Sequence, residues 1–397
     1  MNKPTQTIDT HSVMFITPRP DVIMVEGKGS WLTDNNGKRY LDFLQGWAVN
    51  CLGHCNPGMI EALNKQAKTL INPSPAFFNE PMIGLSNLLT QNSCFDKVFF
   101  ANSGAEANEG AIKLARKWGQ LNKSGAFEII TFDHSFHGRT LATMSASGKP
   151  NWDTMFAPQV AGFPKADLND LESVKKLVTD KTVAVMLEPV QGEGGVIPTT
   201  QEFMRELRKF TKENNILLIA DEVQAGCGRT GALFAYQNYG IEPDIMTLGK
   251  GIGGGVPLAA LLATDAVACF VPGDQGGTYN GNPLMTAVGI SVIEQLLAPG
   301  FLDSVKAKGE LLKSELLKLC AEFNLEGERG EGLLRALMLG KDIGPKLVDL
   351  ARDRGPEGLL INSPRPNLLR FMPALNVSDD EIRQMCNMLR ELLKQVD

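Results

Sequence analysis

The sequence predicts an α/β fold with a largely parallel sheet, because strand-like and helix-like segments alternate through the middle of the chain. Glu128–Phe132, Thr182–Leu187 and Ile216–Ala220 are short runs rich in apolar residues, which is typical of buried strands. Between the last two, Gln201–Asn214 repeats its apolar residues at the helical period. Strands that are joined through helices in this way usually pair in parallel.

The length and charge of the chain narrow the class of protein. With 397 residues it is too long for one small core, so we expect a large domain and a smaller one. The net charge of −6 disfavours nucleic-acid and anionic-membrane partners, which attract basic surfaces. There is no secretory signal, and no apolar run approaches the roughly 18 residues of a membrane span. We therefore expect a cytoplasmic protein.

The seven cysteines are spread along the chain without a C-x-x-C pair, so no disulfide framework is expected. Cys51, His54 and Cys55 are close in sequence, but no second pair of ligands follows at the spacing of a zinc finger. We interpret these three as packing or turn residues and expect no metal.

The two ends of the chain differ from its middle. Near the N-terminus, Asn36-Gly37 between short strand-like runs is a hairpin signal. Near the C-terminus a long helix is expected from about Pro299 to Phe323, and a last helix starts at Ser378, which forms a capping box with Glu381. Short strand-like runs lie between these helices, at Leu333–Leu339, Leu359–Ile361 and Leu368–Met372. We predict that residues 51–295 form the large domain, and that residues 296–397, with strands from residues 1–50, form a smaller α+β domain.

A strand predicted at Lys97–Ala101 leads into a turn that should begin a helix, since Ser103 and Glu106 form a capping box. Unpaired N–H groups at a helix N-terminus attract anions, and Gly104 lets an anion approach the backbone. The turn is therefore either a phosphate cup or simply a well-capped helix. No P-loop and no Rossmann fingerprint is present.

Two further loops follow predicted strands. In the first, Phe136 would stack on a flat cofactor and Arg139 would bind a carboxylate; a core phenylalanine and a solvated arginine are the alternative. In the second, Glu188 and Glu193 lie in a stretch rich in glycine, at the strand end where α/β sheets bind ligands. A polar surface loop is the alternative for the second.

Asp221 and Lys250 are the most informative residues. Each comes at or just after the end of an apolar run that is predicted to be a buried strand, so both side chains should lie at the same end of the sheet. A carboxylate that keeps a pyridine nitrogen protonated, together with a desolvated amine, is what a pyridoxal-phosphate enzyme needs. The glycines that follow Lys250 suggest that the backbone must clear a bound group. A surface lysine after a strand is the alternative.

The chain resembles the class III aminotransferases, which are pyridoxal-phosphate enzymes of fold type I, over almost its whole length. Within that class it is most similar to the acetylornithine aminotransferases. The resemblance implies a large domain with a mostly parallel, mixed seven-stranded sheet flanked by helices, plus a smaller α+β domain. The motifs that carry it are Gly53-His54, Asn102–Asn108 (NSGAEAN), Phe136–Thr140 (FHGRT), Glu188–Gly192 (EPVQG), Asp221–Gln224 (DEVQ), Thr247–Lys250 (TLGK) and Thr278–Pro283 (TYNGNP).

The resemblance also implies roles in holding the cofactor. Lys250 would bind pyridoxal phosphate as a Schiff base and later move a proton, and Asp221 would pair with the pyridine nitrogen. Gln224 would hydrogen-bond the phenolic oxygen of the ring. Further cofactor contacts would come from Ser103, Gly104 and Ala105 at the phosphate, from Val223 and Phe136 on the two ring faces, and from Thr278 of the second subunit of a homodimer.

For the substrate, the resemblance implies that Arg139 binds one carboxylate and Arg370 another. Glu193 would pair with Arg370 when the substrate has no carboxylate there, which avoids an uncompensated buried charge. Phe78 stands where relatives that act on free ornithine have a tyrosine, which suits an acylated α-nitrogen. Gly277 stands where many acetylornithine enzymes have serine or threonine, so a contact there must use the backbone. Trp47 would also shape the pocket.

The implied reaction transfers the δ-amino group of N2-acetylornithine to 2-oxoglutarate, which yields the semialdehyde and glutamate in arginine biosynthesis. Succinylornithine, ornithine, succinyldiaminopimelate and 4-aminobutyrate are alternative donors. A racemase, aminomutase or decarboxylase on the same scaffold is a different class of function, as is a catalytically silent protein with a binding role. Arg139 and the Glu193–Arg370 arrangement argue against a racemase, aminomutase or decarboxylase, since only transamination needs a dicarboxylate as second substrate.

Overall fold

The computed structural model describes residues 10–396, and its centre is a seven-stranded sheet with the order β4-β12-β11-β10-β7-β5-β6. The five strands from β11 to β6 are parallel, and β12 is antiparallel to both of its neighbours. The predicted mostly parallel, mixed seven-stranded sheet is therefore confirmed. Its strands are Lys97–Ala101 (β4), Glu128–Phe132 (β5), Lys165–Ala166 (β6), Thr182–Leu187 (β7), Leu217–Asp221 (β10), Ile245–Leu248 (β11) and Ala259–Ala263 (β12).

Helices cover both faces of this sheet. Successive side chains of β10 enter different clusters: Leu217 and Ile219 pack with α4 (Gly104–Asn122), whereas Leu218 packs with α7 (Gln201–Glu213). Because successive side chains of a strand point to opposite faces, these two helices lie on opposite sides of the sheet. Every residue of β7 and β10 is buried, as expected for parallel strands that are covered on both faces.

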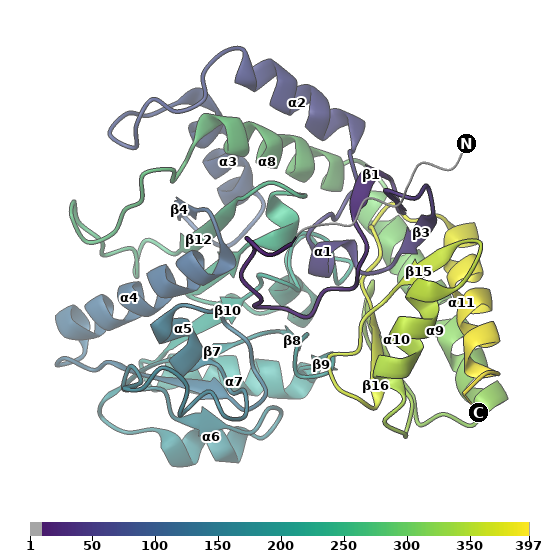
Figure 1. The fold of residues 1–397 in the computed structure, drawn as a ribbon. Coiled ribbons are helices and arrows are strands. Elements are labelled where there is room, and N and C mark those ends of the chain that lie inside the picture. Colours follow the sequence, from purple (N-terminus) through teal and green to yellow (C-terminus); the bar gives the residue numbers. More distant parts are fainter. Residues whose placement is uncertain (1–9, 397) are drawn as a thin grey trace.

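The two ends of the chain share a second sheet, of order β1-β2-β3-β15. The hairpin predicted at Asn36-Gly37 joins β2 and β3, which are antiparallel, and Gly37 adopts the positive φ of +82° that such a turn requires. β15 then pairs in parallel with β3, so that N-terminal and C-terminal strands lie side by side (Figure 1). The strands of this sheet are Met24–Lys28 (β1), Trp31–Asp34 (β2), Arg39–Asp42 (β3) and Gly358–Leu360 (β15).

The C-terminal part forms a further antiparallel sheet, β13-β14-β16, next to three helices. The capping box predicted at Ser378 and Glu381 is present at the start of α11. The predicted long helix starts two residues late, at Phe301, because Gly300 precedes it with a positive φ of +78°. The elements are Gly327–Glu331 (β13), Leu334–Met338 (β14), Leu368–Phe371 (β16), Phe301–Phe323 (α9), Gly344–Asp353 (α10) and Asp379–Leu393 (α11). The division into domains at residues 50 and 295 stays a prediction.

Several helices were not predicted from the sequence, and three of them share one local signal: Pro57–Ala67 (α2), Glu80–Gln91 (α3) and Pro283–Leu296 (α8). Each has an asparagine N-cap followed by a proline in its first turn, and this signal is enough to predict a helix start. α8 packs against both of the others. The remaining short elements are Gln45–Ala48 (α1), Leu141–Ala146 (α5), Leu171–Leu177 (α6), Val190–Gln191 (β8), Ile197–Pro198 (β9), Ala235–Tyr239 (η1) and Lys250–Ile252 (η2).

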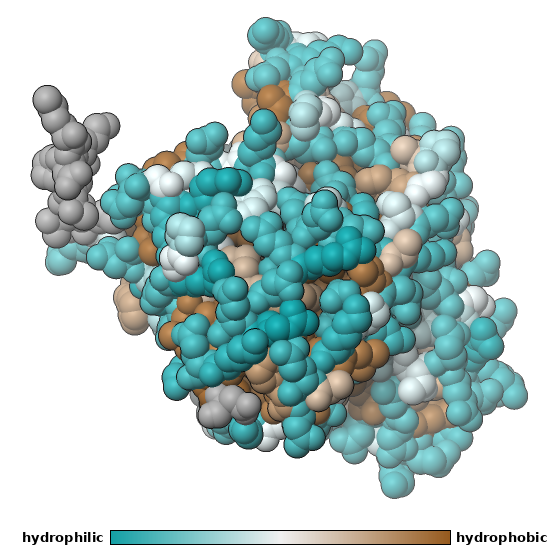
Figure 2. All heavy atoms as spheres, turned by 90° about the vertical axis from the view of Figure 1, so that its right-hand side faces the viewer, coloured by the Kyte–Doolittle hydropathy of each residue, from teal (hydrophilic) through white to brown (hydrophobic). Residues whose placement is uncertain are grey.

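The surface on the side of the C-terminal helices is mostly hydrophilic, with scattered apolar side chains (Figure 2). Within residues 10–396, no single helix is both long and apolar enough to cross a membrane; the pair α8 and α9, bent by 72°, meets that test by length and composition alone.

Candidate active site

Asp221 and Lys250 line one pocket at the carboxyl ends of two neighbouring parallel strands. Asp221 is the last residue of β10 and pairs with Thr247 of β11, and Lys250 follows that strand in the short helix η2. The pocket has a volume of about 250 Å³. Its lining residues are Gly104, Ala105, Asn108, Phe136, His137, Gly138, Arg139, Glu188, Asp221, Val223, Gln224 and Lys250.

The carboxylate of Asp221 is buried and held in one orientation by three close donors, with the hydroxyl of Thr247 more distant at 3.5 Å. Its Oδ2 accepts a hydrogen bond of 2.8 Å from Nδ2 of Asn108 and lies 2.7 Å from Nδ1 of His137. Its Oδ1 accepts a bond of 3.1 Å from the backbone N–H of Val223. Asn108 also donates to the carbonyl of His137, at 2.7 Å, so the three side chains form one network.

Asn108 and His137 had no predicted role, although both lie in the motifs that carry the family resemblance. A signal for Asn108 was present, because it is a polar residue on the apolar face of α4, beside Ala107 and Ala111. Both side chains are about 1% exposed, and a buried polar group needs a partner. Here that partner is Asp221.

The amine of Lys250 has no hydrogen-bond partner in the described part of the chain. Burial is the main reason why its pKa is lowered, and the nearby positive charge of Arg370 acts in the same direction. The backbone of Lys250 has a φ of +45°, an uncommon conformation for a non-glycine residue that marks a constrained position. The structure thus presents an amine whose charged form is less favoured than that of an ordinary lysine.

The start of α4 forms a cup of free N–H groups. The side chain of Ser103 accepts from the N–H of Glu106, and the carboxylate of Glu106 accepts from the N–H of Ser103, which confirms the predicted capping box. The N–H groups of Gly104 and Ala105 have no acceptor within residues 10–396. A Cβ on Gly104 would lie only 2.6 Å from Cγ1 of Val223, so this glycine lets the helix start approach the floor of the pocket.

Phe136 and Gln224 also line this pocket. Phe136 is half-buried and meets Trp152 edge to face, with ring centroids 5.9 Å apart. Gln224 accepts a hydrogen bond from Arg370 at 3.3 Å, but its Nε2 is buried without a partner among the described residues. An orphaned donor of this kind calls for an acceptor that is absent from the chain itself.

Arg370 is fully buried and forms an ion pair with Glu193, with NH2 and Oε1 2.7 Å apart. Burial alone would raise the pKa of Glu193, but the charge and hydrogen bond of Arg370 lower it to about 2. The Nε of Arg370 donates to Asn362 at 3.2 Å. The pair joins β16 to the loop after β8, next to Gln224 of the pocket.

Glu188, a second acid of the same loop region, lies inside the pocket. Burial and the neighbouring charge of Asp221 raise the pKa of Glu188 to about 8. Its Oε1 accepts a hydrogen bond of 2.8 Å from the N–H of Phe136. It therefore ties the loop that carries Phe136 to the end of β7.

Arg139 lines the mouth of the pocket, where it is exposed and has no ion pair in the described part of the chain. Its guanidinium carbon lies 5.5 Å from the ring centroid of Trp152. Trp47 is half-exposed in α1, where four successive residues have φ between +48° and +67°, a left-handed turn that contacts η2. Trp47 does not line the pocket of Lys250.

Phe78, Gly277 and Thr278 do not reach the pocket of Lys250 in a single chain. Phe78 and Gly277 line another pocket, of about 360 Å³, between α3 and the loop that precedes α8. Thr278 is exposed and lines neither pocket.

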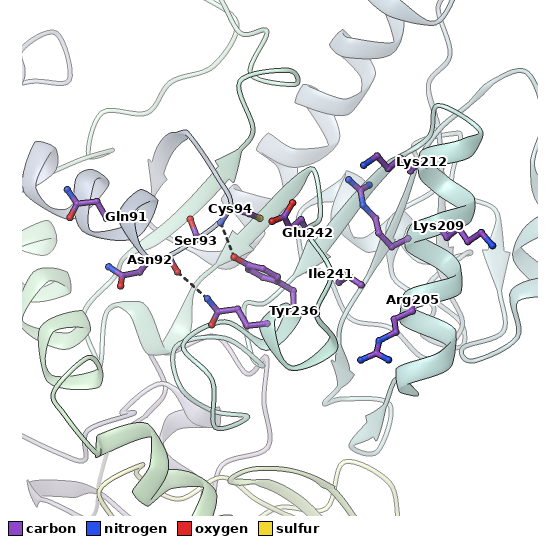
Figure 3. Close-up of a pocket in the computed structure, with 13 residues that line it drawn as sticks. Gln91, Asn92, Ser93, Cys94, Arg205, Lys209, Lys212, Tyr236, Ile241 and Glu242 are labelled. Atoms are coloured by element: carbon purple, nitrogen blue, oxygen red, sulfur yellow. Dashed lines mark hydrogen bonds between the residues drawn. The ribbon is translucent and has the colours of Figure 1, made fainter.

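A larger pocket, of about 930 Å³, lies elsewhere and contains none of the predicted site residues (Figure 3). It separates basic side chains of α7 from residues 91–94, and Arg208 in it forms a bidentate ion pair with Asp244. Asp244 directly precedes β11, so this pocket lies toward the amino ends of the strands, opposite Lys250.

The residues of the pocket that contains Asp221 and Lys250 fit pyridoxal phosphate. It contains an anionic group for a ring nitrogen, an amine for an aldehyde, an N–H cup for a phosphate and an unpartnered amide donor for a phenolic oxygen. The family model for aminotransferase class-III matches residues 16–393.

The chain is a class III aminotransferase.

This aminotransferase depends on pyridoxal phosphate, as its class does. It is 74% identical to the acetylornithine aminotransferase of Ralstonia nicotianae, over 96% of this chain and 97% of that protein. It is 63% identical to acetylornithine aminotransferase 2 of Bordetella pertussis, over 97% and 98%.

Solved structures confirm the predicted fold of type I. The ornithine aminotransferase of Toxoplasma gondii superposes with a TM-score of 0.92 at 30% identity, over 98% of this chain and 94% of that one. The N-acetylornithine aminotransferase of Stenotrophomonas maltophilia gives a TM-score of 0.83 at 35% identity, over 96% and 97%.

Proposed function

We propose that this aminotransferase moves the δ-amino group of N2-acetylornithine to 2-oxoglutarate and forms N-acetylglutamate 5-semialdehyde and glutamate, a step of arginine biosynthesis. The observation that carries the proposal is the buried Arg370–Glu193 pair beside the pocket of Asp221 and Lys250. A removable counterion lets one pocket accept both a donor without a carboxylate on its reacting carbon and a dicarboxylate acceptor that has one there. The names of relatives at 74% and 63% identity support the choice of donor.

The chain's own residues perform the chemistry around the cofactor. Bound pyridoxal phosphate would supply an electron-withdrawing ring that acidifies the reacting carbon of the substrate. Asp221, fixed by Asn108 and His137, would keep the ring nitrogen protonated. Lys250, whose pKa is lowered by burial, would hold the aldehyde carbon until the substrate's amine takes its place. Once released, its amine would take a proton from one carbon and return it to another.

The remaining pocket residues would place the cofactor. The N–H groups of Gly104 and Ala105, at the start of a helix that is capped by Ser103, would bind the phosphate. Nε2 of Gln224 would donate to the phenolic oxygen, which gives the orphaned donor its acceptor. Val223 and Phe136 would contact the two faces of the ring.

Arginines would position the two substrates. Arg139, exposed at the mouth and free of ion pairs within residues 10–396, would bind the carboxylate that both substrates share. Arg370 would bind the second carboxylate of 2-oxoglutarate after Glu193 moves away. With N-acetylornithine bound, Glu193 would stay on Arg370 and neutralise it.

We also propose a homodimer in which each subunit completes the site of the other. Thr278 would add its hydroxyl to the partner's phosphate cup, while Phe78 and Gly277 would line the partner's substrate pocket. In support, these residues lie outside the pocket of their own chain, among exposed apolar side chains: Phe77, Phe78 and Tyr279 are 66%, 85% and 64% exposed. A surface of this kind is typical of an interface. Phe78 would favour an acylated α-nitrogen over a free ammonium, and Trp47 would also shape the substrate pocket.

A panel of donors tests the proposed substrate. The cofactor's visible absorption is followed after mixing the enzyme with each of N-acetylornithine, succinylornithine, ornithine and 4-aminobutyrate. We expect the highest kcat/KM for N-acetylornithine, by about tenfold or more over ornithine, because free ornithine places an unpaired ammonium against Phe78. A higher value for ornithine would refute the assignment of the donor.

A further inference from the structure

A second cation lies beside Glu193, on the side away from Arg370. Nζ of Lys149 is 3.5 Å from Oε2 of Glu193, whereas Arg370 holds the other oxygen, Oε1, at 2.7 Å. Lys149 follows α5 and Arg370 belongs to β16, so the two cations reach the carboxylate from separate parts of the fold. Each oxygen of Glu193 thus faces its own positive group.

Aromatic rings hold Lys149 in this place. Its Nζ lies 4.8 Å from the ring centroid of Phe136 and 5.4 Å from that of Trp152. An ammonium near two aromatic rings is favourably placed by their quadrupoles. The Lys149 and Glu193 side chains are only 24% and 26% exposed, so water screens their interaction in part.

We propose that Lys149 is a positioning residue for substrate exchange, which receives Glu193 when the carboxylate on the reacting carbon of a dicarboxylate substrate takes over Arg370. This inference rests on the exchange of partners at Arg370 that is proposed above. At 3.5 Å the Lys149–Glu193 contact is longer than the roughly 2.8 Å of a charged hydrogen bond, so it strengthens as Glu193 leaves Arg370. Lys149 therefore lowers the free-energy cost of binding 2-oxoglutarate or glutamate and leaves the binding of N-acetylornithine unchanged.

Binding of two matched, unreactive acids to the holoenzyme tests the proposal. Glutarate carries two carboxylates and valerate only one on a chain of the same length. We expect Lys149→Met to raise the Kd of glutarate about fivefold, the effect of losing one partly exposed charge pair, with that of valerate unchanged. Lys149→Arg should restore the wild-type Kd. In steady state, Lys149→Met should raise the KM for 2-oxoglutarate at constant kcat. Lys176→Met, on the exposed side of α6, serves as the control for loss of a lysine.

The Glu193→Ala background separates the proposal from its alternatives. If Lys149 acts through Glu193, the Lys149→Met effect on glutarate disappears in that background. If the effect persists, Lys149 binds the dicarboxylate directly and the proposal is overturned. It is also overturned if Lys149→Met leaves the Kd of glutarate unchanged or lowers it. If Glu193→Ala itself fails to change glutarate binding relative to valerate, the exchange at Arg370 fails, and with it the proposed function of that pair.

Discussion

Nδ1 of His137 lies 2.7 Å from Oδ2 of Asp221, and both side chains are almost fully buried. The other ring nitrogen of His137, Nε2, has no hydrogen-bond partner in the part of the chain that the structure describes. The imidazole of His137 therefore makes its one hydrogen bond with Asp221, whose carboxylate lines the pocket. Its role is to hold that carboxylate in place.

Replacing His137 by alanine should weaken cofactor binding. A hydrogen bond to a charged group contributes about 1.5–3 kcal/mol, so we expect the Kd of pyridoxal phosphate to rise about tenfold or more. Titration of the apoenzyme, followed by protein fluorescence, measures it. Asn108→Ala removes the other side-chain donor that binds Oδ2 and should act in the same direction. Wild-type affinity in both variants would show that Asp221 needs neither donor.

A methyl group at Gly104 should disturb the cofactor pocket, because its Cβ would lie 2.6 Å from Cγ1 of Val223. We expect Gly104→Ala to raise the Kd of pyridoxal phosphate about tenfold, since either the phosphate cup or Val223 has to move. The double variant Gly104→Ala with Val223→Ala should recover part of that loss relative to Val223→Ala alone. The same titration compares the four proteins, and additive effects would contradict a clash between these two residues.

Glu188 should make stability depend on pH. Burial raises its pKa to about 8 from an ordinary 4.5, so between these values the native state binds a proton that the unfolded chain has lost. The free energy of unfolding should therefore fall as pH rises through this window. Glu188→Gln stays neutral throughout, so its free energy of unfolding should fall less. Urea unfolding of both holoenzymes at about pH 5 and about pH 8 measures the difference. If the free energy of unfolding falls equally in the two proteins, the pH dependence comes from a group other than Glu188.

Mixed dimers test whether Thr278 acts in the partner's site. Lys250→Ala subunits lack the amine, and Thr278→Ala subunits lack the hydroxyl that the partner would use. In a mixed dimer, the site with an intact Lys250 would receive Thr278 from the Lys250→Ala chain. We expect activity per mixed dimer to rise toward half of the wild-type value, about one good site of two. If mixing and re-association give no more than the average of the two parents, Thr278 does not act across a dimer.

Loss of Glu193 should shift the preference between substrates. Without it, Arg370 remains buried and unpaired unless the substrate supplies a carboxylate. We expect Glu193→Ala to favour dicarboxylates and α-amino donors over N-acetylornithine by about tenfold or more in relative kcat/KM. Glu193→Asp, which keeps the charge, is the control. An unchanged ratio of half-reaction rates would contradict the proposed exchange of partners.

Local patterns in the sequence determined much of the fold. The capping boxes at Ser103 and Ser378 and the hairpin at Asn36-Gly37 were predictable, because their hydrogen bonds join residues only a few positions apart. The buried strands before Asp221 and Lys250 were predictable from uninterrupted apolar runs. Helices such as α2 were not predicted from periodicity, because tertiary packing contributes most of their stability, although the asparagine N-cap and proline of α2 gave a local signal for its start.

The sequence by itself determined the family, the cofactor chemistry and the residues that end β10 and follow β11, since these depend on residue type and local strand structure. Tertiary structure alone decided what surrounds them. Glu193 and Arg370 are 177 residues apart, so no local pattern predicts their contact and only the family resemblance gave it as an expectation. Lys149 comes from a third segment, and its contact with Glu193 was not expected from the sequence. Packing between separate sheets sets such contacts, and it likewise leaves Thr278 outside the pocket of its own chain.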